Sequence, residues 1–92
     1  MLYLISYDIP LDKRRLKVAR TLEGAGQRVQ RSVFECDLTP AQWGVLHRRL
    51  LKLIDVSEDS LRIYRLCGSC VNQIAMYGPG PAVESSPDVW IV

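Results

Sequence analysis

Apolar residues dominate the start of the chain and alternate between aromatic and aliphatic side chains. The stretch Leu2–Pro10 reads Leu-Tyr-Leu-Ile-Ser-Tyr-Asp-Ile-Pro, which is typical of a mostly buried strand. Pro10 cannot donate to a strand ladder and favours extended backbone at Ile9, so the strand should end there. We therefore expect a central strand that carries one acid, Asp8, to the edge of a sheet.

A helical period replaces the strand pattern after Pro10. The first predicted helix runs from about Asp12, a suitable N-cap, to Gly24, where glycine stops it. Arg15 falls inside its apolar sector, so a helix packed on the sheet would direct Arg15 toward the end of the first strand, near Asp8. The expected apolar face consists of Leu16, Val18, Ala19 and Leu22.

The second helix has a sharper start. Residues Thr39–Gln42 form a capping-box sequence with proline at the first helical position. The helix should end near Leu53, before Asp55. Apolar residues follow the cap at core spacing: Trp43, Leu46, Leu50 and Leu53.

Further strands are expected in both halves of the chain. The region Gln27–Leu38 is long for one strand, and Gln30–Ser32 could be a turn or bulge between two shorter ones; the sequence leaves both open. Leu61–Leu66 and Val71–Tyr77 are predicted to pair as an antiparallel hairpin joined by the turn at 67–70.

Residues 79–92 are expected to form a linker and a tail strand. The linker is rich in glycine, proline and serine. The apolar end, Val89–Val92, should add as a strand to a sheet edge, in its own chain or in a partner. Residues 1–78 would then form one domain.

The order of these elements predicts an α+β fold. If the region 27–38 is split, the first six elements follow the ferredoxin-like, or split β-α-β, plan, with two helices on one face of an antiparallel sheet. The other face also needs cover, and a second copy of the chain in a homodimer is the simplest source.

Composition narrows the class of protein. The chain has 92 residues, 48% of them hydrophobic, which suits one small core. No apolar run is long enough to cross a bilayer, and the early charges do not fit a signal peptide, so we expect a cytoplasmic protein that does not bind membranes. The odd cysteine count, three, does not suggest a secreted disulfide framework.

Positive charge is concentrated in the body of the chain. All twelve Lys and Arg residues lie between Lys13 and Arg65, although the net charge is only +2. This distribution is compatible with an anionic partner or with an ordinary solvated surface. The candidate nucleic-acid contacts are Tyr7, Arg14, Arg15, Arg28, Arg31 and Phe34, because arginines anchor phosphates and aromatics stack on bases. The alternative for Phe34 is a core aromatic.

Asp8 is the candidate metal ligand. Hard cations such as Mg²⁺ take oxygen ligands, often only one or two carboxylates, with water and substrate phosphate completing the shell. A two-fold axis that paired two Asp8 side chains would favour this interpretation. The alternative is an aspartate that closes a turn or pairs with Arg15.

The sequence Cys67-Gly-Ser-Cys70 has the spacing of a zinc half-site or a redox pair. Cys36 and His47 do not have the spacing that would complete a four-ligand site. A reduced turn is the alternative for this segment.

Several of these motifs together resemble the CRISPR-associated Cas-two family. They are Tyr7-Asp8-Ile9, then Asp12-Lys13-Arg14-Arg15, then the stretch Gly26–Glu35, the strand Leu61–Tyr64 and the apolar tail. The resemblance implies a ferredoxin-like homodimer whose C-terminal strands cross to the partner's sheet. It implies that Asp8 binds Mg²⁺ and is catalytic, and that Tyr7, Arg15, Arg28 and Phe34 are contacts, with Arg14 and Arg31 as adjacent candidates.

The resemblance supports two functional hypotheses within prokaryotic antiviral defence. In the first, the chain is a Mg²⁺-dependent endonuclease on RNA or DNA. In the second, it is a non-catalytic scaffold that binds duplex DNA and bridges dimers of the Cas-one integrase during spacer acquisition. Asp8 carries the first hypothesis, and the basic surface and the tail strand carry the second.

Overall fold

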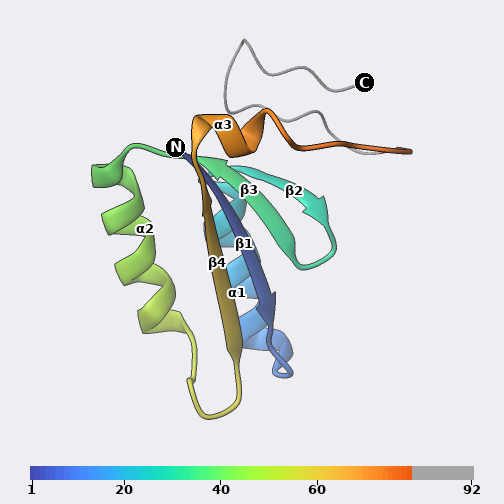
Figure 1. The fold of residues 1–92 in the computed structure, drawn as a ribbon. Coiled ribbons are helices and arrows are strands. Elements are labelled where there is room, and N and C mark those ends of the chain that lie inside the picture. Colours follow the sequence, from blue (N-terminus) through green and yellow to red (C-terminus); the bar gives the residue numbers. More distant parts are fainter. Residues whose placement is uncertain (80–92) are drawn as a thin grey trace.

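An antiparallel sheet carries two helices on one of its faces (Figure 1). The computed structural model describes residues 1–79. Apart from Pro79, the predicted linker and tail strand lie outside the described residues. The elements in chain order are β1 (Leu2–Asp8), α1 (Asp12–Glu23), β2 (Gln27–Gln30), β3 (Val33–Asp37), α2 (Pro40–Leu53), β4 (Ser60–Leu66) and the short α3 (Gly68–Val71).

The strand order is β2-β3-β1-β4, and every neighbouring pair is antiparallel. With its two helical crossovers this is the ferredoxin-like fold, which confirms the predicted fold class. The region 27–38 is two strands, separated by a turn at residues 31–32, and their pairing is irregular between Arg28 and Gln30. β1 is central, because it pairs with β3 on one side and β4 on the other.

Alternation along β1 decides which of its side chains enter the core. Tyr3, Ile5 and Tyr7 face the helices and are at most 5% exposed. Their intervening neighbours lie on the opposite face of the sheet. The core between sheet and helices is completed by Ile9, Val18, Ala19, Leu22, Phe34, Cys36, Leu38, Leu46 and Leu50.

Helix α1 corrects two details of the sequence prediction. Its N-cap is Leu11, with no side-chain cap hydrogen bond, because Asp12 is already helical and pairs with Arg15. Leu16 is 54% exposed. The buried stripe runs through Val18 and its neighbours at the i, i+3, i+4 spacing that starts at Arg15, and Leu16 lies beside that stripe.

Helix α2 begins and ends as predicted. The backbone N–H of Gln42 donates to the Thr39 hydroxyl at 3.2 Å, and the Gln42 side-chain oxygen accepts from the Thr39 N–H at 2.9 Å. These two bonds satisfy donors that the first turn of a helix leaves unpaired. Among the helices of residues 1–79, none combines the length and the apolar character that a membrane crossing requires.

The predicted hairpin after β4 is wrong. Residues 68–71 form α3, and the described residues 72–79 contain no strand. The reason is that Val71, only 4% exposed, turns inward and packs with Leu2, Leu66 and Ile74. This small second cluster lies at one end of the sheet, on the face opposite α1 and α2.

Arg14 ties the loop after α2 to the start of α1. Its guanidinium donates to both carboxylate oxygens of Asp59, at 2.8 and 3.1 Å, and to Glu58 at 2.9 Å. The Asp59 side chain is fully covered, and its other contact is the backbone N–H of Asp55. These bonds, above all those from Arg14, hold the pKa of Asp59 below its usual range.

The lowered pKa of Asp59 predicts a stability that depends on pH. Its contribution is complete above the unfolded-state value, about 3.9, and is lost as the pH falls through the lower folded-state value. We expect Asp59→Asn to lower the urea midpoint of unfolding at pH 7. The difference in midpoint between the variant and the unmodified chain should become smaller toward pH 3. Asp37→Asn, which removes an exposed ion pair with the N-terminus, should change the midpoint little. A gap that stays constant down to pH 3 would contradict this assignment.

Gly26 permits close contact between the end of α1 and β3. A Cβ atom at this position would lie 2.2 Å from the Glu35 carbonyl oxygen and 2.6 Å from the Cys36 sulfur. Both neighbours belong to the sheet and cannot move away cheaply.

We therefore expect Gly26→Ala to destabilise the fold by about 1–3 kcal/mol, the usual cost of overpacking. The matched control is Gly24→Ala, where the nearest atom would be 3.6 Å away. Urea denaturation followed by circular dichroism measures both. Equal stability of the two variants would show that the sheet adjusts to the added methyl group.

Candidate nucleic-acid interface and metal-binding residue

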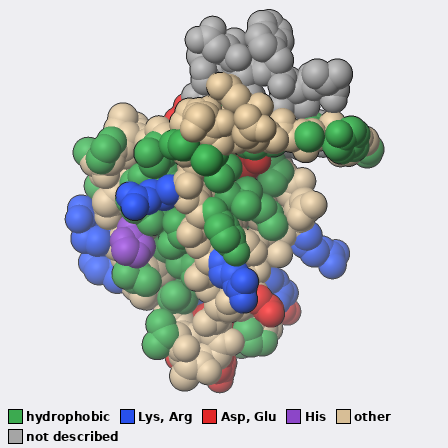
Figure 2. Space-filling model, in the orientation of Figure 1, with side chains coloured by type: hydrophobic (Ala, Val, Ile, Leu, Met, Phe, Trp, Pro, Cys, Tyr) green, Lys and Arg blue, Asp and Glu red, His purple; other side chains and the backbone are tan. Residues whose placement is uncertain are grey.

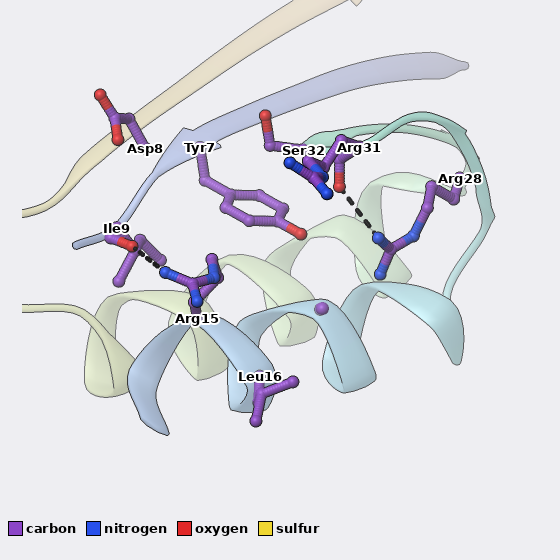
Figure 3. A pocket seen from close by; sticks show the side chains of 9 residues that line it. Tyr7, Asp8, Ile9, Arg15, Leu16, Arg28, Arg31 and Ser32 are labelled. Atoms are coloured by element: carbon purple, nitrogen blue, oxygen red, sulfur yellow. Dashed lines mark hydrogen bonds between the residues drawn. The ribbon is translucent and has the colours of Figure 1, made fainter. Parts of the chain in front are cut away.

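A surface pocket of about 590 Å³ lies where β1 ends, between the first half of α1 and the β2–β3 turn (Figure 3). It brings together most of the candidate residues that the sequence analysis selected, from elements far apart along the chain. The lining consists of Tyr7, Asp8, Ile9, Arg15, Leu16, Ala19, Arg28, Arg31 and Ser32.

Arg15 is fixed at the end of β1. One guanidinium nitrogen donates to the Ile9 carbonyl oxygen at 3.0 Å, and another bonds the Asp12 carboxylate. The direction predicted for Arg15 is therefore confirmed, but its partner is the backbone of the strand and not the Asp8 carboxylate. With 43% of its side chain exposed, Arg15 still presents donors to the pocket.

Arg28 is held on the opposite wall of the pocket. It donates to the Arg31 carbonyl oxygen at 3.0 Å and to the Glu23 carboxylate at 3.1 Å. Its guanidinium carbon also lies 5.1 Å from the centre of the Phe34 ring, within the range of a cation–π contact. These three contacts fix the position of one cationic group without covering it, since 42% of the side chain is exposed.

The two aromatic candidates, Tyr7 and Phe34, are buried beneath the arginine side chains of the pocket. Phe34 is 0% exposed, so the core alternative holds and no face of this ring is open for stacking on a base. Tyr7 lies 6.3 Å from Phe34, ring centre to ring centre, and is 5% exposed. Figure 3 shows the Tyr7 hydroxyl end directed toward the side of the pocket where Arg28 lies.

Two arginines differ sharply in their availability. Arg31 is exposed, and its side chain forms no hydrogen bond or ion pair with any residue of the described range 1–79. Arg14, by contrast, does not line the pocket, and its guanidinium forms ion pairs with Asp59 and Glu58. The structure therefore gives Arg14 a structural role and leaves Arg31 free to bind an anion.

Asp8 points to the other side of the sheet. Figure 3 shows its carboxylate directed away from Tyr7, across β1, as the alternation of a strand requires. The side chain is exposed and has no ion pair or hydrogen bond within the part of the chain that the structure describes. Asp8 therefore presents a free carboxylate on the face opposite the helices.

Residues 1–79 of one chain contain no cluster of three His, Cys, Asp or Glu side chains that could hold a metal ion. Glu35, whose pKa is raised by burial, lies on the same face but opposite Leu4 in the register. Leu4 is four residues from Asp8, about 13 Å along the strand. The exposed Asp8 carboxylate could supply one oxygen ligand to Mg²⁺, with the others from water, substrate, a second chain or residues outside the range 1–79.

Arg62 is a candidate that the sequence analysis missed. It lies opposite Ser6 in the β1–β4 register, and Ser60 lies opposite Asp8. Arg62 is therefore a diagonal neighbour of Asp8 on the same face, a separation that a long side chain can bridge. The sequence did contain a signal for this position of Arg62. Apolar and polar residues alternate at Leu61, Arg62 and Ile63, which places Arg62 on the sheet face away from the core.

Comparisons with known proteins show the family of the chain. The family described as CRISPR associated protein Cas2 matches residues 1–74. The relative named CRISPR-associated endoribonuclease Cas2 1, from Chloroflexus aurantiacus, is 56% identical over all of this chain and all of its own. The crystal structure of Streptococcus pyogenes Cas2 at pH 6.5 superposes with a TM-score of 0.74 at 37% identity, covering 85% of this chain and 100% of that one.

A chain in a solved assembly is also similar. It belongs to the structure described as a partial Cas6-RT-Cas1–Cas2 complex, with a TM-score of 0.69 and 36% identity, covering 79% of this chain and 86% of that one. From the match over residues 1–74 and the identity along the whole length, we conclude that this chain belongs to the family of CRISPR-associated protein Cas2.

Proposed function

We propose that this chain forms a homodimer that cleaves RNA with Mg²⁺, using one Asp8 from each subunit. The observation that carries the proposal is the exposed Asp8 carboxylate, free of partners among residues 1–79, on the sheet face opposite the helices. The name of the 56% identical relative, an endoribonuclease, supports RNA as the substrate. A CRISPR-associated nuclease of this kind serves prokaryotic antiviral defence.

The face that carries Asp8 is suited to a second subunit. Figure 2 shows hydrophobic side chains gathered over the middle of the sheet on this side. A hollow of about 610 Å³ is lined by Leu4, Val33 and Tyr64 from the sheet and by residues of the segment after α3. Tyr64 is 47% exposed. Apolar surface of this kind on one face of an antiparallel sheet favours burial against a partner.

A two-fold axis that passes close to Asp8 on this face would bring two Asp8 carboxylates together at the interface between the subunits. Two carboxylates, water and a substrate phosphate together complete the oxygen shell that Mg²⁺ prefers. A bound Mg²⁺ would supply Lewis-acid activation of water and of the phosphodiester. Arg62, a diagonal neighbour of Asp8 across β1 and β4, would hold the phosphate being cleaved.

The pocket on the helix side supports a second function, which we propose as the alternative. Arg15, Arg28 and Arg31 lie on the opposite side of the sheet from Asp8, so a dimer formed through the other face leaves them accessible. Such a surface would hold the phosphates of duplex DNA in a non-catalytic scaffold. The similar chain in a Cas1–Cas2 assembly supports this role together with the Cas1 integrase.

Replacing Asp8 separates these two functions. In the nuclease, we expect Asp8→Ala to lower Mg²⁺-dependent cleavage of single-stranded RNA by about 10²-fold or more, the scale for loss of an electrostatic group at a transition state. The matched control is Asp37→Ala, which removes a carboxylate at the other end of the sheet. Cleavage that persists in Asp8→Ala while Asp37→Ala is also active would reject the catalytic proposal.

Replacing Arg31 tests the pocket as a phosphate-binding surface. Since Arg31 forms no ion pair within residues 1–79, Arg31→Ala should leave the fold intact. We expect weaker binding of both duplex DNA and single-stranded RNA, and a slope of log affinity against log salt that is smaller by about 1. Fluorescence anisotropy at several salt concentrations measures this slope. Arg20→Ala, on another surface of α1, is the control, and an equal loss in both variants would rule out a specific pocket.

A further inference from the structure

Two exposed cysteines lie together where β4 ends. The sulfur atoms of Cys67 and Cys70 are 3.3 Å apart, and both thiols are free. The Ser69 hydroxyl oxygen lies 3.1 Å from the Cys67 sulfur. A disulfide requires a sulfur separation of about 2.05 Å, so a small rotation of the two side chains closes the bond. Apart from its two chain neighbours, no atom of residues 1–79 lies within 4 Å of a Cβ atom placed on Gly68.

The surroundings make the two thiols chemically unequal. Hydrogen bonds from the Ser69 hydroxyl, and then from the Cys70 backbone and thiol, lower the pKa of Cys67 to about 7. The contact with Cys67 raises the pKa of Cys70. The third cysteine, Cys36, is buried, and burial raises the pKa of its thiol to about 11. Of the three cysteines, Cys67 therefore favours the thiolate most, and the thiolate is the attacking species in disulfide exchange.

We propose that Cys67 and Cys70 form a thiol–disulfide exchange site that accepts small-molecule disulfides such as oxidised glutathione. The Cys67 thiolate attacks one sulfur of the disulfide, whose S–S bond breaks and releases one thiol. Cys70 loses its proton to solvent and attacks the Cys67 sulfur, which releases the second thiol. In balance, the two thiols of the chain are oxidised to one disulfide, and the small disulfide is reduced to two thiols.

Geometry favours this redox role over a metal site. C-x₂-C supplies two sulfur ligands, whereas a structural zinc site takes four. In the described residues 1–79, no third His, Cys, Asp or Glu is placed to join the pair. The position also allows oxidation without unfolding, because both cysteines are exposed and lie outside the sheet, Cys67 as the N-cap of α3 and Cys70 within α3, while Val71 packs α3 against Leu2 and Leu66.

The experiment exposes the full chain to oxidised glutathione at pH 7, followed by acid quenching, alkylation and peptide mass spectrometry. We expect the unmodified chain to form the Cys67–Cys70 disulfide without a lasting glutathione adduct, and dithiothreitol to reverse the reaction. Cys36 should remain reduced. Circular dichroism before and after oxidation should show an unchanged fold.

Single serine variants distinguish Cys67, the thiol that attacks the small disulfide, from Cys70, the thiol that then attacks Cys67. In Cys70→Ser, which keeps a donor beside Cys67, we expect a stable glutathione adduct on Cys67. In Cys67→Ser, the adduct on Cys70 should form about five- to tenfold more slowly, as expected from a smaller thiolate fraction partly offset by greater intrinsic nucleophilicity. A glutathione adduct that persists in the unmodified chain, or equal rates in the two variants, would overturn the proposal.

Discussion

The two hydrogen-bonded ladders of β1 are the constraint on which the rest of the structure depends. β1 pairs along its length with β4 and over most of it with β3, so its register and the direction of each side chain are fixed. Successive residues must then point to opposite faces. At the end of the strand this rule sends Tyr7 and Ile9 into the helix side and Asp8 to the other side. The acid and the arginine pocket are consequently neighbours in sequence but occupy different surfaces.

The arginine pocket owes its geometry to the backbone and core beneath it. Arg15 bonds the Ile9 carbonyl, and Arg28 bonds the Arg31 carbonyl while lying over the Phe34 ring. Guanidinium groups held in this way lose little further freedom when a phosphate binds, which favours affinity. Phe34 thus affects the proposed interface through the position of Arg28, without touching a ligand.

Much of the fold follows from local patterns in the sequence. The alternation in residues 2–9, the capping box at Thr39 and the helical stripe through Val18 each depend on near neighbours, and each predicts its element well. The hairpin prediction failed because Val71 and Ile74 can occupy a strand or cover an apolar cluster, and only the position of Leu2 decides between these outcomes. The ion pair of Arg14 was not predictable for a related reason, since its partner Asp59 is 45 residues away.

The site itself was predictable as a set of residues but not as an arrangement. Tyr7, Arg15, Arg28 and Arg31 line one pocket, which Asp8 borders at the end of β1 while its carboxylate points to the other face of the sheet. The face that Tyr7, Asp8 and Arg28 occupy depends on strand register, and the turn at residues 31–32 sets the register of β2 against β3. Arg62 joined the candidates only when its pairing with Ser6 placed it beside Asp8.

The central claim is that Asp8 contributes one of two carboxylates to a cation site shared between two chains. Titration of the full chain with Mn²⁺ in place of Mg²⁺, followed by electron paramagnetic resonance, measures it most directly. A shared site predicts one bound Mn²⁺ for every two chains, with binding lost in Asp8→Asn. Binding of one Mn²⁺ per monomeric chain, or binding unaffected by Asp8→Asn, would contradict it.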